Sequence, residues 1–452
     1  MKMNSMEILK TIPFSELYMW DVKRFVSTNI KSKYNIVVLA EHIIERSEKV
    51  KLFEFPDEKF GILGVNNKIG LFDAYEEYGK NINQAYKIVK NNDLAYNPYR
   101  INVGSIGWKT ENQKYNYISP AYVVFSCHNG LKSEFLYRIF KTETFNKIIR
   151  ENTTGSVRQN LKFDTLEKIK IPLPPLEEQN RLVANYNAKI ELANRLEAKA
   201  EELEQEIENY LFEVLGIEKL EEKETKKGLQ FVRFKDIDVW GVDKLSYGNI
   251  RQILKSNIYQ NKKLKEIAYI NPRTDISSYD NDYKMSFIPM KYISDDYGEI
   301  TNMDTGEKAQ SKGYTKFQEG DLLWSRITPC MQNGKSAIAT NLLNGLGYGS
   351  TEYHVIRKIN NNILIEYVYV LLRTKAVRFD AMNYFTGSAG QQRVPRTYLE
   401  NLAIPLPPLK IQQEIANHIS ELKQQIKDLQ NRAKENRELA IKEFESEIFL
   451  KG

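Results

Sequence analysis

A hexapeptide that occurs twice constrains the fold of this chain more than any other feature of its sequence. The segment Ile171 to Leu176, with the sequence IPLPPL, returns unchanged at Ile404 to Leu409, 233 residues further along a chain of 452. Downstream of it, Gln179 corresponds to Gln412 at the same spacing. Self-similarity at half the length of a chain is the signature of a duplicated unit. We therefore expect two copies of one fold, each a globular module followed by the segment that begins at the hexapeptide.

The repeat extends far upstream of the hexapeptide. Four further pairs of segments correspond: Leu166-Glu167 with Leu399-Glu400, Thr154-Gly155-Ser156 with Thr386-Gly387-Ser388, residues 135–142 with 367–374, and Trp20-Asp21-Val22 with Trp240-Gly241-Val242. Such a chain is a pseudo-dimer within one polypeptide, so its two halves can diverge in what they bind.

The residues after each Pro-Pro pair have the pattern of a long helix. Proline is tolerated in a first helical turn, and Glu177 and Glu178 suit the positive end of the helix dipole. Apolar residues then recur at steps of three and four, with Lys189 as a break in the first copy. These residues are Leu182, Tyr186, Ala193, Leu196, Ala200 and Ile207, and Ile415, Ile419, Leu422, Ile426, Leu429, Ala433 and Ala440. A narrow apolar stripe favours an intramolecular antiparallel coiled coil of two rods, each about 60 Å long. The alternative is that each helix packs on its own module.

The modules themselves have mixed α/β character. Short strand-like runs alternate with loops, at Tyr34 to Leu39, Ala121 to Phe125, Ser286 to Pro289 and Tyr353 to Arg357. One amphipathic helix is expected in each module, at residues 134–150 and 366–382. We therefore predict the α/β (α+β) class, with two pseudo-repeated globular α/β domains separated by two long antiparallel coiled-coil helices.

The predicted boundaries follow from the repeat. The two domains are expected at residues 1–170 and 229–403, a central helix and linker at 171–228, and a C-terminal helix at 404–452. Within the central segment, the charged run Leu220 to Gly228 is expected to form the linker.

The charge of the chain is distributed unevenly between these segments. Residues 1–170 contain 26 basic and 19 acidic residues, and residues 229–403 contain 23 and 18. Residues 171–228 contain 8 basic and 14 acidic residues, and residues 404–452 contain 8 of each. Two basic modules joined by acidic or neutral spacers suit a polyanion held at two places, although an excess of this size is common on ordinary surfaces.

Composition and motifs exclude several classes of protein. Two cysteines and four scattered histidines cannot build a disulfide scaffold or a spaced set of zinc ligands. The sequence contains neither a signal-peptide pattern at residues 1–20 nor an apolar run of about 18 residues, so we expect a cytoplasmic protein that does not enter a membrane. Asn333-Gly334-Lys335-Ser336 imitates the end of a phosphate-binding loop, but Pro329 stands where that loop needs glycine. With no triad, HExxH or paired-carboxylate pattern, a binding protein is favoured over an enzyme.

This architecture resembles the specificity subunit of type I restriction–modification enzymes. The repeated IPLPPLxxQ helix carries the resemblance, which covers nearly the whole chain. In addition, residues 96–107 (YNPYRINVGSIG) resemble a recurrent segment of target-recognition domains, and residues 324–335 (WSRITPCMQNGK) resemble its alternative form.

The resemblance implies a subunit without catalysis of its own that binds double-stranded DNA. Each target-recognition domain would read one half of a bipartite sequence, and the helices would set the spacer and dock two methyltransferase subunits. It also implies motor and nuclease subunits as further partners. No cofactor is expected on this chain; S-adenosylmethionine would belong to the methyltransferases, and ATP with magnesium to the nuclease.

Residues that can hydrogen-bond base edges are the candidates for DNA contact, since arginine suits guanine, and asparagine or glutamine suits adenine. One loop in each copy follows the expected helix: Thr154, Ser156, Arg158, Gln159 and Asn160, and Thr386, Ser388, Gln391, Gln392 and Arg393. The second patch contains Tyr99, Arg100 and Asn102 in the first copy, and Ser325, Arg326, Thr328, Asn333 and Lys335 in the second. Polar surface loops, and burial of Tyr99, are the competing interpretations.

Two other functions remain open from the sequence. One is a coiled-coil scaffold with two protein-binding domains, whose affinity for DNA would not depend on base sequence. The other is a self-contained DNA methyltransferase or nuclease, which would bind S-adenosylmethionine without partners.

Overall fold

The computed structural model describes residues 30–153, 160–218, 253–388 and 390–450. These residues form two compact units. The first comprises the described residues up to Arg195 together with those from Arg432 onward, and the second lies within Leu196–Asn431. The predicted linker at 220–228 lies outside the described residues.

The first unit is built from three sheets and short helices. Its strands are β1 (Asn35–Val38), β2 (Ile43–Glu45), β3 (Lys49–Val50), β4 (Lys59–Asn66), β5 (Gly70–Tyr78), β6 (Tyr86–Ile88), β7 (Leu94–Tyr96), β8 (Ile106–Trp108), β9 (Tyr117–Ile118), β10 (Val123–Cys127) and β11 (Lys170–Leu173). Its short α-helices are α2 (Ser133–Ile139), α3 (Glu143–Asn152) and α4 (Phe163–Leu166). The sheet orders are β1-β11, β2-β10-β7-β8 and β3-β6-β9-β4-β5.

The second unit repeats this plan. Its strands are β12 (Asn261–Lys263), β13 (Ala268–Ile270), β14 (Lys284–Ile288), β15 (Asp304–Glu307), β16 (Thr315–Gln318), β17 (Leu322–Ser325), β18 (Ser336–Ile338), β19 (Leu346–Gly349), β20 (Tyr353–Lys358) and β21 (Ala403–Pro405). Its short α-helices are α7 (Ile365–Arg373), α8 (Lys375–Met382) and α9 (Arg396–Asn401). The sheet orders are β12-β21, β13-β20-β17-β18 and β15-β14-β19-β16.

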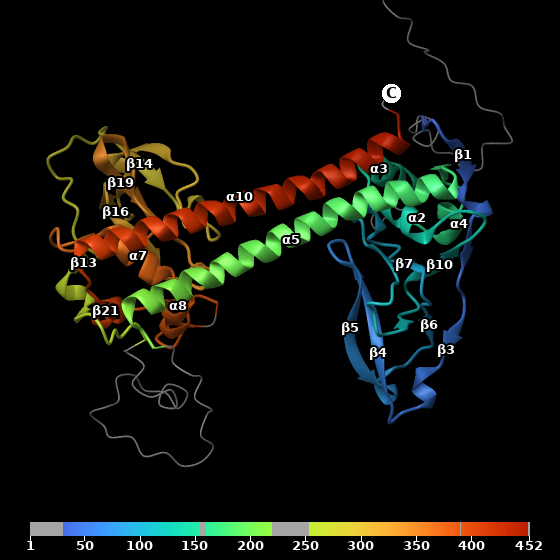
Figure 1. Ribbon diagram of the computed structural model, residues 1–452, viewed down its shortest axis with the longest axis horizontal. Coiled ribbons are helices and arrows are strands. Elements are labelled where there is room, and N and C mark those ends of the chain that lie inside the picture. The colour runs from blue at the N-terminus through green and yellow to red at the C-terminus, as the bar shows by residue number, and fades with distance from the viewer. Residues whose placement is uncertain (1–29, 154–159, 219–252, 389, 451–452) are drawn as a thin grey trace, which may run out of the picture. The chain divides into compact units, whose positions relative to one another are not determined.

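The duplicated fold that the repeat predicts is confirmed by these topologies. The sheet β2-β10-β7-β8 of the first unit has the same order as β13-β20-β17-β18 of the second, and its strands pair antiparallel in both. The units differ in their remaining larger sheet. In the first unit this sheet has five strands and contains the long hairpin β4–β5 (Figure 1), whereas in the second it has four strands, in the order β15-β14-β19-β16. Each sheet includes one parallel pair, β4–β9 in the first unit and β14–β19 in the second.

The prediction of a single amphipathic helix in each module is wrong, because two helices form there: α2 and α3 in the first unit, and α7 and α8 in the second. A threonine separates them: the Thr142 hydroxyl accepts a hydrogen bond from Phe145 N and caps α3, and the Thr374 hydroxyl accepts one from Val377 N and caps α8. The extended backbone of these threonines stops the preceding helix, while their side chains satisfy the first N–H groups of the next.

The two long helices are α5 (Leu176–Leu215) and α10 (Leu409–Ile448), each of 40 residues. They run antiparallel beside each other within each unit (Figure 1). In the first unit, Tyr186 contacts Phe444, and the Lys189 ammonium lies 3.1 Å from the Glu443 carboxylate, which accounts for the break in the apolar stripe. In the second unit the buried stripe consists of Ala200, Leu203, Leu422 and Ile426. The predicted antiparallel pair is therefore confirmed.

The ends of both helices also belong to the cores of the units. In the first unit, Tyr186 of α5 and Phe444 of α10 lie in the same buried cluster as Phe135 of α2. In the second, Leu211 of α5 and Ile415 of α10 lie with Leu371 of α7. No helix of the described segments is both long enough and apolar enough to cross a bilayer.

The repeated glutamine explains why the hexapeptide and its helix recur as one motif. Gln179 is completely buried; its side-chain oxygen accepts from Lys132 N at 3.0 Å, and its amide donates to the carbonyls of Gly130 and Pro174. Gln412, also completely buried, makes the equivalent bonds, accepting from Leu364 N at 2.9 Å. Each glutamine therefore ties the start of a long helix to the start of α2 or α7.

Candidate nucleic-acid interface

Three segments of the second unit meet at residues that the sequence predicts to contact DNA. They are residues 326–328 after β17, residues 350–352 before β20, and residues 386–388 with 390–394 between α8 and α9. Thr386 and Arg393 exchange two backbone hydrogen bonds of 2.9 Å and so form a hairpin. This hairpin is hydrogen-bonded to residues 326–328. Thr328 N donates to Gln392 O at 3.0 Å, and Val394 N donates to Arg326 O at 2.8 Å. The two predicted patches of the second copy are thus partly one surface.

The tip of this hairpin is exposed. Thr386, Ser388 and Gln391 are exposed, and Gln392 and Arg393 are half-buried. Gly387 and Gly390 have φ angles of 104° and 85°, which residues with a Cβ rarely adopt, so glycine allows the chain to turn here. Hydroxyl, amide and guanidinium groups are therefore presented together on a tight turn.

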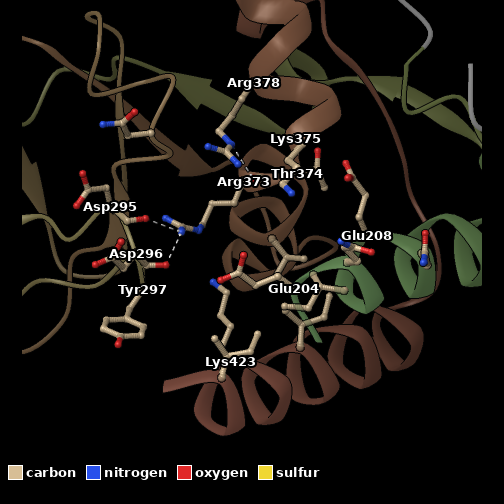
Figure 2. A pocket seen from close by; sticks show the side chains of 17 residues that line it. Glu204, Glu208, Asp295, Asp296, Tyr297, Arg373, Thr374, Lys375, Arg378 and Lys423 are labelled. Carbon is tan, nitrogen blue, oxygen red and sulfur yellow. Dashed lines mark hydrogen bonds between the residues drawn. The ribbon is translucent and has the colours of Figure 1, made fainter. Parts of the chain in front are cut away.

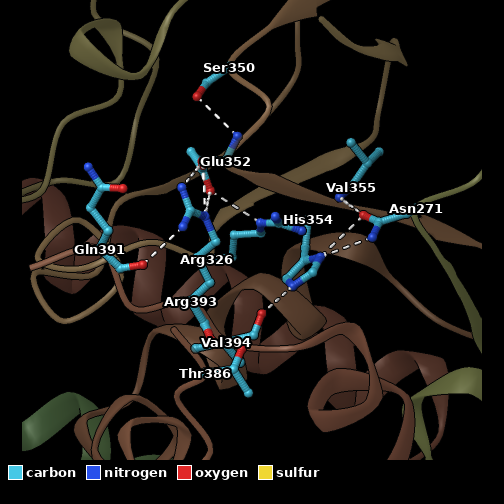
Figure 3. Close-up of polar contacts among 10 residues, drawn as sticks. All are labelled: Asn271, Arg326, Ser350, Glu352, His354, Val355, Thr386, Gln391, Arg393 and Val394. Atoms are coloured by element: carbon cyan, nitrogen blue, oxygen red, sulfur yellow. Dashed lines mark hydrogen bonds and ion pairs between the residues drawn. The ribbon is translucent and has the colours of Figure 1, made fainter. Parts of the chain in front are cut away.

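Glu352 joins the two arginines of this surface (Figure 3). Its carboxylate lies 2.8 Å from Nη2 of Arg393 and 3.2 Å from Nε of Arg326. Hydrogen bonds from Arg393 and then Arg326 hold the pKa of the Glu352 carboxyl below its ordinary value, and the same contact raises the pKa of Arg393. Because two guanidinium groups share one carboxylate, the cluster retains a net positive charge.

His354 holds the end of the hairpin through a hydrogen bond to the backbone of Val394 (Figure 3). Its imidazole is completely buried, with Nε2 2.9 Å from Val394 O and Nδ1 3.0 Å from the Asn271 amide nitrogen. Burial lowers the pKa of His354 to about 4. The ring is therefore neutral near pH 7, and it donates from Nε2 to Val394 while Nδ1 accepts from Asn271.

Some of the residues predicted to contact DNA do not lie on this surface. Ser325 is completely buried in β17, which leaves it no surface for a base contact, and the Thr328 hydroxyl is buried as well. The Lys335 ammonium donates to Ile293 O at 2.9 Å and so holds a neighbouring loop. Arg326 and the hairpin thus remain as the candidate surface of the second unit.

Asn333 lies elsewhere, in a cavity of about 480 Å³ beside α8 (Figure 2). Arg373 crosses this cavity and donates to the carbonyls of Gly334, Asp295 and Asp296, at 2.5, 3.1 and 3.3 Å. Acidic and basic side chains both line the walls, from α5, α8, α10 and the loop at 295–297. We interpret the cavity as the place where Arg373 anchors the loop that follows β17.

A separate open cleft of about 570 Å³ adjoins Arg326, and two of its basic residues were not predicted from the sequence. Arg273 and Lys316 line it together with Arg326, and Asp275 is the acidic residue among them. Lys316 is held by the carbonyl of Ser311 at 3.0 Å. These cations extend the positive surface beyond the hairpin, and only their basic character could have indicated them in the sequence.

The first unit presents a corresponding loop after β7. Tyr99 is 56% exposed, so the competing interpretation that it is buried is wrong. The nearby Tyr96, in β7, is completely buried. Arg100 is exposed and Asn102 is half-buried. Leu161 N donates to Pro98 O at 3.0 Å, as Val394 N does to Arg326 O. Asn160 is half-buried next to this bond, whereas Thr154, Ser156, Arg158 and Gln159 lie outside the described residues.

A basic side chain at an equivalent position in each unit holds the loop that follows β7 or β17. Lys141 donates to Gly104 O at 3.2 Å in the first unit, as Arg373 does to Gly334 O in the second. Each cation comes directly before the threonine that caps α3 or α8. Burial lowers the pKa of Lys141 to about 8. The two candidate surfaces are therefore built on the same scaffold with different side chains. Among the described residues, no group of three histidine, cysteine or acidic side chains could hold a metal ion.

Comparisons with known proteins agree with this architecture. A family model described as the type I restriction modification DNA specificity domain matches residues 22–205 and 258–437. The type I restriction enzyme EcoAI specificity subunit of Escherichia coli is 42% identical over 162 residues, which are 35% of this chain and 27% of that protein. The EcoKI specificity subunit of Escherichia coli K12 is 24% identical over 296 residues, covering 64% of this chain and 58% of that protein. The alignments thus span less than two thirds of either relative.

A solved structure shares the fold at low sequence identity. It comes from work on the structural basis underlying complex assembly and conformational transition of the type I R-M system, and it matches with a TM-score of 0.55 and 16% identity. The match covers 93% of this chain and 99% of the solved one. Because the family model matches both halves of the repeat, the chain belongs to the type I restriction–modification DNA specificity family.

Proposed function

We propose that this chain is the sequence-specific DNA-binding subunit of a type I restriction–modification complex. Each target-recognition domain, at 1–170 and 229–403, reads one half of a bipartite DNA site. The chain itself performs no catalysis. The location that this function requires is the cytoplasm.

The observation that carries this proposal is the duplicated surface loop. Both units place an exposed loop after the third strand of the shared sheet and tie it to the segment before α4 or α9. The scaffolds are equivalent, but one surface presents Tyr99, Arg100 and Asn102, and the other presents Arg326, Gln391 and Arg393. An asymmetric bipartite sequence requires two recognition surfaces with different side chains, and these two units provide them on the same fold.

The helix pair supports the second part of the proposal. A long helix that joins the cores of two recognition domains sets the number of unread base pairs between half-sites, because the domains must meet the same face of the duplex. Two methyltransferase subunits would dock on the helices and bind S-adenosylmethionine. Motor and nuclease subunits that use ATP and magnesium would join the complex for cleavage.

The first test is a methylation map by long-read sequencing, in the host and in a strain without this gene. We expect one split, adenine-methylated motif to disappear with the gene and to return with a plasmid copy. If no motif changes, the full chain is purified with its methyltransferase subunits and offered a pool of random duplexes. Recovery without sequence preference would contradict the proposal and favour the coiled-coil scaffold.

The spacing role has a separate test. Seven residues, two helical turns, are inserted at equivalent mid-helix positions of α5 and α10, so that the apolar stripe stays in register. The insertion adds about 10 Å, or about three base pairs of duplex. The expected motif has a longer spacer and unchanged half-sites. An altered half-site would contradict the role of the helices as a spacer.

A further inference from the structure

A carboxylate in the middle of a surface that binds DNA needs an explanation, because phosphates repel it. Glu352 is such a residue, since it lies between Arg326 and Arg393, on the segment that precedes β20. Its side chain is 20% exposed, less than either arginine. What it contributes to DNA recognition depends on which of its hydrogen-bonding positions are already occupied.

The arginines occupy the whole carboxylate of Glu352. Oε1 accepts from Nε and Nη2 of Arg393, at 3.1 and 2.8 Å, and Oε2 accepts from Nε of Arg393 and of Arg326, at 2.9 and 3.2 Å. An ionised carboxylate has about four lone-pair positions. The single Nε–H of Arg393 is shared between both oxygens, so three N–H groups engage the carboxylate, and each of its oxygens already accepts from arginine. We therefore assign Glu352 to the arginines and not to a base.

The same contacts leave a defined part of Arg393 for a ligand. A guanidinium group has five N–H donors in one plane. The edge with Nε and Nη2 faces Glu352, and Nη1 gives one hydrogen to Gln391 O at 3.0 Å. Nη1 and Nη2 each keep one hydrogen that no contact within the described residues uses. The side chain is 33% exposed, so solvent or a ligand can reach it.

The backbone of Arg393 is held as firmly as its side chain. It is paired with Thr386 across the hairpin and bridged to Ile327 on the other side. Fixing both the Cα position and the guanidinium plane removes conformational freedom that binding would otherwise have to remove. Guanine is the base that fits two neighbouring donors, because it presents N7 and O6 in the major groove.

We propose that Glu352 is a positioning residue that presents Arg393 to a guanine in the half-site read by the second domain. This inference rests on the proposed function of the chain and adds to it the identity of one recognised base. Glu352 acts through Arg393, and it orients the free donor pair while its own oxygens remain occupied.

The test is selection from random duplexes by the full chain co-purified with its methyltransferase subunits. Wild-type protein should select a guanine at one position of the second half-site. R393A and E352Q should each reduce that preference about tenfold or more, with the first half-site unchanged. R393K keeps the charge but not the planar fork, so it should lose the guanine preference while non-specific affinity is retained. E307Q removes a carboxylate paired with Lys284 on the other sheet and is the matched control.

A double variant separates positioning from a general loss of structure. If Glu352 acts through Arg393, adding E352Q to R393A changes the preference at that position no further. A full guanine preference in E352Q, or no guanine there in the wild-type motif, would overturn the inference while leaving the proposed function intact. Absence of any selected sequence would instead contradict the proposed function. Equal weakening of both half-sites by E352Q, with a lower melting temperature, would mean a structural role and would also overturn the inference.

Discussion

Glu445 of α10 caps the N-terminus of α3, since its carboxylate accepts a hydrogen bond of 2.7 Å from the backbone N–H of Thr144. The second unit has the corresponding contact, in which Glu208 of α5 accepts from Ala376 N of α8 at 3.0 Å. In each unit, therefore, the long helix that follows the other module supplies the cap. The C-terminal part of α10 is thereby attached to the first unit, and the C-terminal part of α5 is attached to the second.

The substitution E445A should destabilise the start of α3 by about 1 kcal/mol, the usual loss when a helix cap is removed. Hydrogen exchange at Thr144 and Phe145 should become about fivefold faster, while the second unit is unaffected. E443A is the control, because Glu443 pairs with Lys189 at an exposed position, where ion pairs contribute little. Equal effects of the two variants would contradict the capping role.

The substitution Q412L should cost about 3 kcal/mol, because it leaves Leu364 N and the carbonyls of Asn362 and Pro407 without their buried partner. Denaturant unfolding, with hydrogen exchange at the start of α7 as a local probe, measures this loss. Gln413 bonds the exposed side chain of Asn417, so Q413L should change stability by less than about 0.5 kcal/mol. A small effect of Q412L would mean that the glutamine does not fasten the helix.

The buried His354 makes the second unit sensitive to acid. Its folded pKa of about 4 lies below the ordinary value of 6.5, so the unfolded chain binds a proton that the folded chain does not. This contribution to stability is present above pH 6.5 and is lost as pH falls toward 4, by about 3 kcal/mol in total. The substitution H354Q should therefore flatten the pH dependence of unfolding in this range. The same slope in both proteins would show that another group is responsible.

The two cysteines should react at different rates. Burial raises the pKa of the Cys127 thiol to about 12, so almost none of it is thiolate near neutral pH. Cys330 lies in the loop after β17, next to the candidate surface, and should account for the faster reaction with a thiol reagent. A duplex with the selected sequence should slow the labelling of Cys330, and C330S should abolish the fast phase. Labelling that DNA does not slow would place this loop away from the duplex.

Much of the fold could be predicted because it is repeated. The hexapeptide and Gln179 with Gln412 predicted two equivalent units, and the apolar stripe predicted the helix pair. The interruption of the short helices at Thr142 and Thr374 could not be predicted in the same way, since the amphipathic pattern continues through both residues. A capping bond competes there with helix continuation, and it depends on local geometry.

The candidate site was less predictable for a related reason. Arg326 and Arg393 were found from their residue type, but Glu352 was not, because its role comes from partners 26 and 41 residues away. Ser325 was selected as a polar residue of a loop motif, yet it ends a strand that is completely buried. Residue type indicates which groups can contact a base, whereas three-dimensional contacts decide which of them remain available.

The shared helix ends have a consequence for the order in which the units are completed during synthesis. The second unit is contiguous in sequence, from Leu196 to Asn431, and all of its core residues have been made by then. The first unit starts earlier but waits for Ala440, Phe444 and Ile448, which fill its core from the far end of α10. At about 5–20 residues per second, the ribosome takes on the order of ten to fifty seconds to make the intervening chain. The first unit is therefore translated first but completes its core last. Until α10 has been synthesised, the core residues that α10 covers are exposed, and chaperones can bind them.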